Sequence, residues 1–106
     1  MTPAALEVLA EPRRVEILDL LRDGEQAVNW IVDRLGISQP AVSKHLRILR
    51  DSGLVNVRID AQRRFYRIRP EPLAELDEWL SAYRELWDKH LDLLEEHLDE
   101  RRRRSE

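Results

Sequence analysis

Two helical patterns separated by a very short link constrain the fold of this chain more than any other feature of its sequence. The first covers about 27–35 and places its apolar residues at helical spacing, namely Val28, Ile31 and Leu35. The second covers about 38–51 and has a similar stripe, formed by Val42, Leu46 and Leu49. Gly36 ends the first helix and Ser38 is a candidate N-cap of the second, so we expect a helix-turn-helix.

A stretch of alternating apolar and polar residues follows at 54–69. Residues 54–60 alternate and residues 64–69 alternate again, which predicts a β-hairpin. The segment between them, around Ala61 and Gln62, has no glycine, so we expect a loop of several residues rather than a tight two-residue turn. A helix-turn-helix followed by a basic hairpin is a winged helix-turn-helix, a mainly α fold with a small β-hairpin and the order α-α-α-α-β-β-α.

Two helices are expected before this motif. Thr2 suits an N-cap and Pro3 suits a first helical position, which predicts a helix over about 3–10. A second helix is expected over 12–22, with apolar residues clustered at helical spacing: Val15, Ile17, Leu18, Leu20 and Leu21. With 106 residues in total, the chain fits one domain over 1–106.

The last expected helix is long for so small a chain. It covers about 71–100, and Arg101 to Arg104 follow as a frayed basic tail. Its apolar residues keep a seven-residue repeat, which predicts a seam against a second copy of the chain. The expected homodimer interface combines this helix with the first one, through Leu6, Leu9, Leu73, Leu76, Leu80, Tyr83, Trp87 and Leu94. The alternative is an amphipathic helix that covers the core of its own domain.

The net charge of −3 hides a strong segregation along the chain. Residues 1–37 carry four Lys/Arg against seven Asp/Glu, residues 38–70 carry eight against two, and residues 71–100 carry two against eleven. A basic segment within an acidic chain predicts a face for a polyanion. A solvated surface paired with the acidic helix is the alternative.

Composition argues against several other classes of protein. No apolar run approaches the length of a membrane-spanning helix and the first residues lack a secretory signal, so we expect a cytoplasmic protein with no membrane partner. The absence of cysteine excludes disulfides, thiolate metal sites and cysteine nucleophiles. Because the sequence shows neither a nucleophile with a base nor a pair of carboxylates in a pocket, we expect no enzymatic activity and no cofactor.

The helix over 38–51 is the expected recognition helix for double-stranded DNA. If its apolar stripe is buried, Gln39 and Ser43 point outward, where an amide can bond to adenine and a hydroxyl to a base or a phosphate. The candidate DNA contacts on this helix and on the wing over 54–69 are Ser38, Gln39, Pro40, Ser43, Lys44, Arg47, Arg50, Arg63 and Arg64. Ser38 has the alternative of acting only as a cap, and Arg47 that of a solvated side chain.

Three stretches of the chain resemble the ArsR/SmtB group of bacterial winged-helix repressors. They are AEPRRVEILDLLRDG, DRLGISQPAVSKHLRILRDSGLV and RRFYRI. The resemblance implies a homodimer built from the first and last helices, which controls transcription by binding an imperfect palindrome. It also implies DNA contacts for Gln39, Ser43 and His45 and a wing contact for the Arg63-Arg64 pair. The alternative for His45 is a packed residue that anchors the helix.

The resemblance breaks down at the metal sites. Metal-sensing members carry Cys-Val-Cys where this chain has Ala27-Val28-Asn29. A second family site uses histidines and carboxylates of the last helix, and its candidates here are Asp88, His90, His97 and Glu100. The two halves of this set, Asp88 with His90 and His97 with Glu100, lie about one helical turn closer together than in the family pattern. We expect no metal, with histidines that are structural or respond to pH. A metal-responsive repressor and a protein-interaction module on the same fold are the remaining alternatives.

Overall fold

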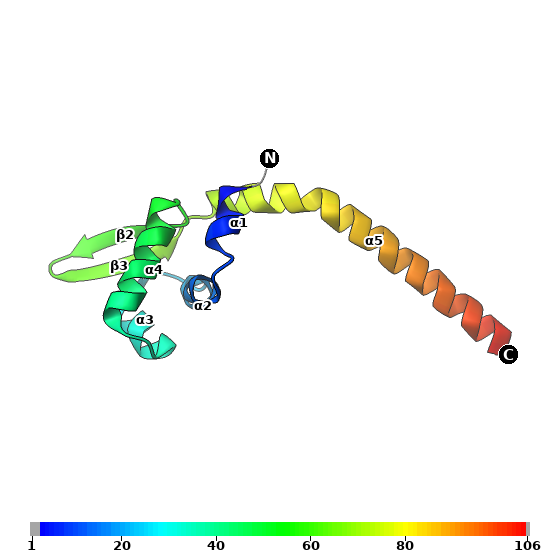
Figure 1. Ribbon diagram of the computed structural model, residues 1–106, viewed down its shortest axis with the longest axis horizontal. Coiled ribbons are helices and arrows are strands. Elements are labelled where there is room, and N and C mark those ends of the chain that lie inside the picture. The colour runs from blue at the N-terminus through cyan, green and yellow to red at the C-terminus, as the bar shows by residue number, and fades with distance from the viewer. Residues whose placement is uncertain (1–2, 106) are drawn as a thin grey trace. The chain divides into compact units, whose positions relative to one another are not determined.

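The computed structural model describes residues 3–105 and divides the chain into two compact units, Met1–Leu76 and Asp77–Glu106. The elements are α1 (Ala4–Val8), α2 (Pro12–Leu21), β1 (Gln26–Ala27), α3 (Val28–Leu35), α4 (Gln39–Asp51), β2 (Val55–Asp60), β3 (Arg63–Ile68) and α5 (Glu71–Ser105) (Figure 1). The expected winged helix-turn-helix is therefore present, with one additional short strand. The N-cap predicted at Thr2 lies outside the described residues, and α1 ends at Val8 rather than near Ala10.

The helix-turn-helix is formed by α3 and α4, joined as the sequence predicts. Gly36 adopts a left-handed conformation with φ of +68° and donates its N–H to the Val32 carbonyl at 3.1 Å, which ends α3. Ser38 then caps α4, because its Oγ accepts a 3.3 Å hydrogen bond from the Ala41 N–H.

The core of the first unit lies where α2, α3 and α4 meet the sheet. Its completely buried members include the stripe predicted for α4, Val42, Leu46 and Leu49, together with Ile17, Ile31 and Leu54. Truncation of such a leucine to alanine costs about 2 to 5 kcal/mol. Of the apolar residues expected to cluster on α2, Val15 is an exception because it is 39% exposed.

The wing belongs to a three-stranded antiparallel sheet in the order β1-β3-β2. The sequence predicts the hairpin of β2 and β3, but not β1. Gln26 pairs with Tyr66 and Ala27 with Phe65, so β1 joins the sheet directly before α3 begins. A strand of two residues has no periodic pattern, which is why alternation along the sequence does not indicate it.

The turn of the hairpin corrects a second expectation. Asp60 pairs with Arg63, so only Ala61 and Gln62 form the turn, and the loop of several residues predicted here is wrong. Ala61 provides the positive φ that a tight hairpin turn needs, at +56°. Alanine replaces the usual glycine at this position at a cost of about 1 to 2 kcal/mol.

The second unit, Asp77–Glu106, consists of the continuation of α5, which remains helical to Ser105. The prediction of a frayed tail at Arg101 to Arg104 is therefore wrong. Basic side chains near a helix C-terminus stabilise the helix, because they interact favourably with its macrodipole. Within this unit Arg84 pairs with Asp77 at 2.7 Å and the rings of Trp79 and Tyr83 lie 4.9 Å apart. No described helix is long and apolar enough to cross a membrane.

Candidate nucleic-acid interface

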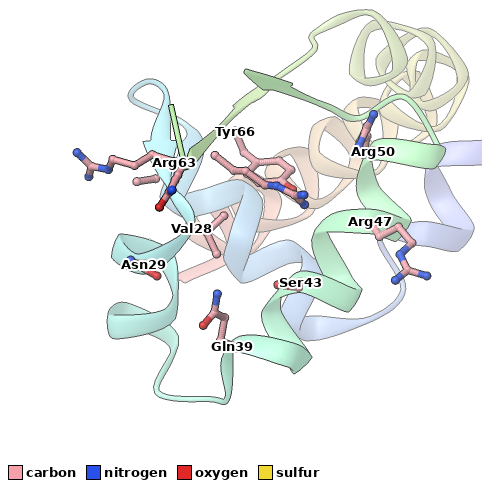
Figure 2. Close-up of a pocket in the computed structure, with 11 residues that line it drawn as sticks. Val28, Asn29, Gln39, Ser43, Arg47, Arg50, Arg63 and Tyr66 are labelled. Carbon is pink, nitrogen blue, oxygen red and sulfur yellow. The ribbon is translucent and has the colours of Figure 1, made fainter. Parts of the chain in front are cut away.

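A hollow of about 380 Å³ opens between α4, the start of α3 and the wing (Figure 2). We call it the arginine hollow, because four of its lining side chains are arginines. Its lining residues are Ala27, Val28, Asn29, Gln39, Ser43, Arg47, Arg50, Gln62, Arg63, Arg64 and Tyr66. Residues far apart in the sequence thus form one polar, concave surface.

The spacing of residues along α4 explains its contribution to the arginine hollow. Gln39, Ser43 and Arg47 follow each other at intervals of four residues, and Arg50 follows three residues later, so they share one side of the helix. All four are exposed, whereas the stripe at 42, 46 and 49 is buried. The packing of that stripe against the core therefore fixes which side of α4 faces outward.

The cations of the arginine hollow are available to an external anion. Among residues 3–105, Arg47, Arg50 and Arg64 form no ion pair with any carboxylate, and neither does the neighbouring Lys44. Several cations close together without counter-ions produce a positive potential that attracts a polyanion.

Arg58, by contrast, has a structural role in the sheet. Its Nη2 donates to Glu25 Oε1 at 2.6 Å, its Nη1 lies 3.6 Å from Asp60 Oδ2, and its guanidinium stacks 4.6 Å from the Phe65 ring centre. The hydrogen bonds from Arg58 lower the pKa of Glu25 below its ordinary value, and the same contact raises the pKa of Arg58. Its charge is therefore balanced within the chain.

The structure brings together most of the DNA-contact candidates that the sequence provides. Gln39, Ser43, Arg47, Arg50, Arg63 and Arg64 line the arginine hollow. Ser38, Pro40 and Lys44 are exposed on α4 or at its start but lie outside the hollow. Sequence reasoning missed the other five lining residues, Ala27, Val28, Asn29, Gln62 and Tyr66. The strand β1 brings the start of α3 beside the wing, and the sequence carries no sign of that strand.

His45 is half-buried on α4 and does not line the arginine hollow. Its Nδ1 is buried and has no hydrogen-bond partner among the described residues. This placement favours the packed alternative over a direct contact with a base.

The four metal-ligand candidates all lie on α5 within the second unit. Within residues 3–105, no group of three or more histidines, cysteines or acidic residues is close enough to hold a metal ion. His90 instead stacks on Trp87, with ring centres 5.8 Å apart. A site made from Asp88, His90, His97 and Glu100 would therefore need ligands from a second chain.

Comparisons with known proteins place this arrangement in a family. The family model described as "Bacterial regulatory protein, arsR family" matches residues 11–57. Nodulation protein NolR of Rhizobium meliloti is 35% identical over 91 residues, which are 86% of this chain and 72% of NolR. The biofilm growth-associated repressor of Agrobacterium fabrum is 38% identical over 77 residues, 73% of this chain and 66% of the repressor.

A solved relative shares the fold as well as the sequence. The structure of HlyU from Vibrio cholerae superposes with a TM-score of 0.63 at 40% identity and covers 74% of this chain and 87% of HlyU's. HlyU is named a transcriptional activator, and this chain spans 56% of its full length. The chain also spans 31% of an HTH-type transcriptional regulator of Mycobacterium tuberculosis. By sequence and by winged helix-turn-helix fold, the chain belongs to the arsR family of bacterial regulatory proteins.

Proposed function

We propose that this chain is a sequence-specific DNA-binding repressor that acts in the cytoplasm as a homodimer on an imperfect palindrome. The observation that carries the proposal is the arginine hollow, where α4 and the wing present arginines without counter-ions beside the amide of Gln39 and the hydroxyl of Ser43. Amides and hydroxyls read base edges, while guanidinium groups bind phosphates. The proposal requires no catalytic group and no cofactor.

Each side chain has an expected role at the DNA. Gln39 lies in the first turn of α4, the part of a recognition helix that contacts base edges, and can bond to adenine in the major groove. Ser43, one turn further, bonds to a base or a phosphate. Arg47, Arg50 and Arg64 neutralise phosphates on either side of the contacted bases.

The exposed apolar face of α5 supports the proposed homodimer. Leu80, Tyr83, Trp87 and Leu94 are all exposed in the single chain, and Trp87 is 60% exposed. Such a face on a long helix is typical of an interface. Leu6 on α1 is also exposed, while Leu9 and Leu73 pack partly on the core of their own chain and are expected at the edge of the interface.

The test is selection of bound sequences from a pool of random DNA duplexes with the purified protein. The wild type is expected to enrich two related half-sites about one helical turn apart. Gln39→Ala should relax the preference at one position in each half-site and weaken binding to the selected duplex by about 1 to 3 kcal/mol. Asn56→Ala, which removes an exposed amide of β2 outside the hollow, is the matched control. Enrichment of no sequence by the wild type would instead support a protein-interaction module on this fold.

A further inference from the structure

Ile59 is an apolar residue in an unusual place. Its side chain is 65% exposed, whereas the next most exposed large apolar residue among residues 3–76, Val15, is 39% exposed. Ile59 is the next-to-last residue of β2, at the end of the wing farthest from the core stripe of α4. Most of its side chain is therefore open to solvent.

The strand register gives Ile59 a specific neighbour. It lies directly opposite Arg64 on β3, so the two side chains leave the same face of the sheet about 5 Å apart at Cβ. Val57 and Tyr66 form the next pair on this face, and Tyr66 lines the arginine hollow together with Arg64. We call this the inner face of the wing.

The opposite, outer face differs in its electrostatics. There Arg58 is held by Glu25 and Asp60, and Arg63 stacks 5.2 Å from the ring centre of Phe65. Arg64 on the inner face has no ion pair with any described residue. The inner face at the tip of the wing therefore presents a guanidinium without a counter-ion, and an apolar side chain lies beside it.

We infer that Ile59 enters the minor groove beside each half-site and selects A·T pairs there, while Arg64 holds a phosphate at the edge of that groove. The inference rests on the proposed DNA-binding function and deepens it. Arg64 remains at the edge of the groove, where its guanidinium neutralises a phosphate and is attracted by the negative potential of a narrow groove. Ile59 reaches the floor of the groove, where apolar side chains of other minor-groove proteins contact the base pairs.

The chemistry of the groove floor explains the selection. A·T pairs present only acceptors, adenine N3 and thymine O2, whereas a G·C pair adds the N2 amino group of guanine. An isoleucine on the floor would clash with that amino group and leave its N–H without a partner. Alanine in place of Ile59 would leave room for the amino group, so the preference would weaken.

The test uses the duplex selected by the wild type, with the base pairs flanking each half-site varied. One duplex carries A·T flanks, a second carries G·C flanks, and a third carries inosine·C flanks, which keep the major-groove groups of G·C but lack the guanine amino group. The wild type should bind the A·T and inosine duplexes about fivefold or more tightly than the G·C duplex. In Ile59→Ala this ratio should fall toward one, while Asn56→Ala on the outer face keeps it. Thermal unfolding of each variant verifies that the wing is intact.

Two results would overturn the inference. If Ile59→Ala discriminates against the G·C duplex as strongly as the wild type, Ile59 does not read the groove. If inosine·C behaves like G·C in the wild type, the amino group is not what is sensed. Both results leave half-site binding in place, whereas failure of the proposed function itself appears as the absence of any selected half-site.

Discussion

Arg58 on β2 donates a 2.6 Å hydrogen bond to the carboxylate of Glu25, across the full width of the sheet. Glu25 directly precedes β1, and β3 lies between β1 and β2, so the side chain of Arg58 spans the central strand over its partner Phe65. The contact ties the wing to the segment that leads into α3.

This contact predicts a pH dependence of stability. Arg58 lowers the pKa of Glu25, so the stabilisation is complete above the ordinary glutamate pKa of 4.5 and is lost as the pH falls through the lower folded-state pKa. Glu25→Gln should therefore unfold at a lower temperature than the wild type at neutral pH, and the difference should vanish in acid. Arg58→Gln should lose at least as much, because it also loses its contacts with Asp60 and Phe65, and adding Glu25→Gln to Arg58→Gln should cause no further loss. Equal differences at all pH values would argue against the ion pair.

Removal of Arg64 should affect specific and random DNA alike. Arg64→Ala is expected to reduce the slope of log affinity against log salt by about 0.9 for each phosphate that is no longer neutralised, summed over both subunits. The control is Arg22→Ala, which removes an exposed arginine of the same unit outside the arginine hollow. Titrations between about 50 and 200 mM salt give the slopes. An unchanged slope in Arg64→Ala would remove this residue from the interface.

A charge placed on the apolar face of α5 should separate the subunits. Trp87→Glu would bury an unpaired carboxylate in the interface, which costs several kcal/mol, so sedimentation should show a monomer where the wild type is a dimer. Ser81→Glu adds the same charge on the charged side of the helix and should leave the dimer intact. A wild-type monomer at micromolar concentration would contradict the interface.

Metal removal is expected to leave DNA affinity unchanged. Ala27 and Asn29 stand where metal-sensing members of the family have cysteines, and the two histidines of α5 lie closer together than in the family's second metal site. Affinity for the selected duplex should be the same before and after dialysis against a chelator. A tightly retained zinc ion whose removal changes affinity by more than about tenfold would point to a site shared between two copies of α5.

The turn of the wing offers a stability test. Ala61→Gly removes the Cβ from a left-handed position and should leave the free energy of unfolding unchanged or raise it by up to about 1 kcal/mol. Ala61→Val should lower it, because a β-branched residue tolerates positive φ poorly. In the exposed helical position of Ala74, the same change to glycine should cost about 1 kcal/mol. Equal destabilisation by glycine at 61 and at 74 would contradict the left-handed conformation of Ala61.

Local chemistry makes much of this fold predictable. Gly36, Ser38 and the stripe on α4 can be identified because a left-handed cap, a hydroxyl N-cap and a helical period each leave a mark within a few residues. These features also set which residues of α4 face outward, and so most of the candidate site. The sequence also predicts α5, but it does not predict that this helix continues to Ser105.

The features that could not be predicted depend on contacts between distant segments. β1 is only two residues long and forms through pairing with β3 some forty positions later in the chain. The ion pair of Glu25 with Arg58 and the place of Asn29 in the hollow follow from that pairing. The tight turn could not be predicted for another reason. The pairing of Asp60 with Arg63 leaves only two residues for the turn, and this forces Ala61 into a positive φ that its side chain disfavours.

The short strand β1 also has a mechanical consequence. Ala27 is paired with β3 and is followed immediately by α3, so the wing and the helix-turn-helix are joined by hydrogen bonds over a span of one peptide unit. This pairing thereby fixes the distance between the wing tip and α4 within narrow limits. Such a protein would tolerate substitution of the exposed side chains on α4 and on the wing far better than a change in the distance between these two elements.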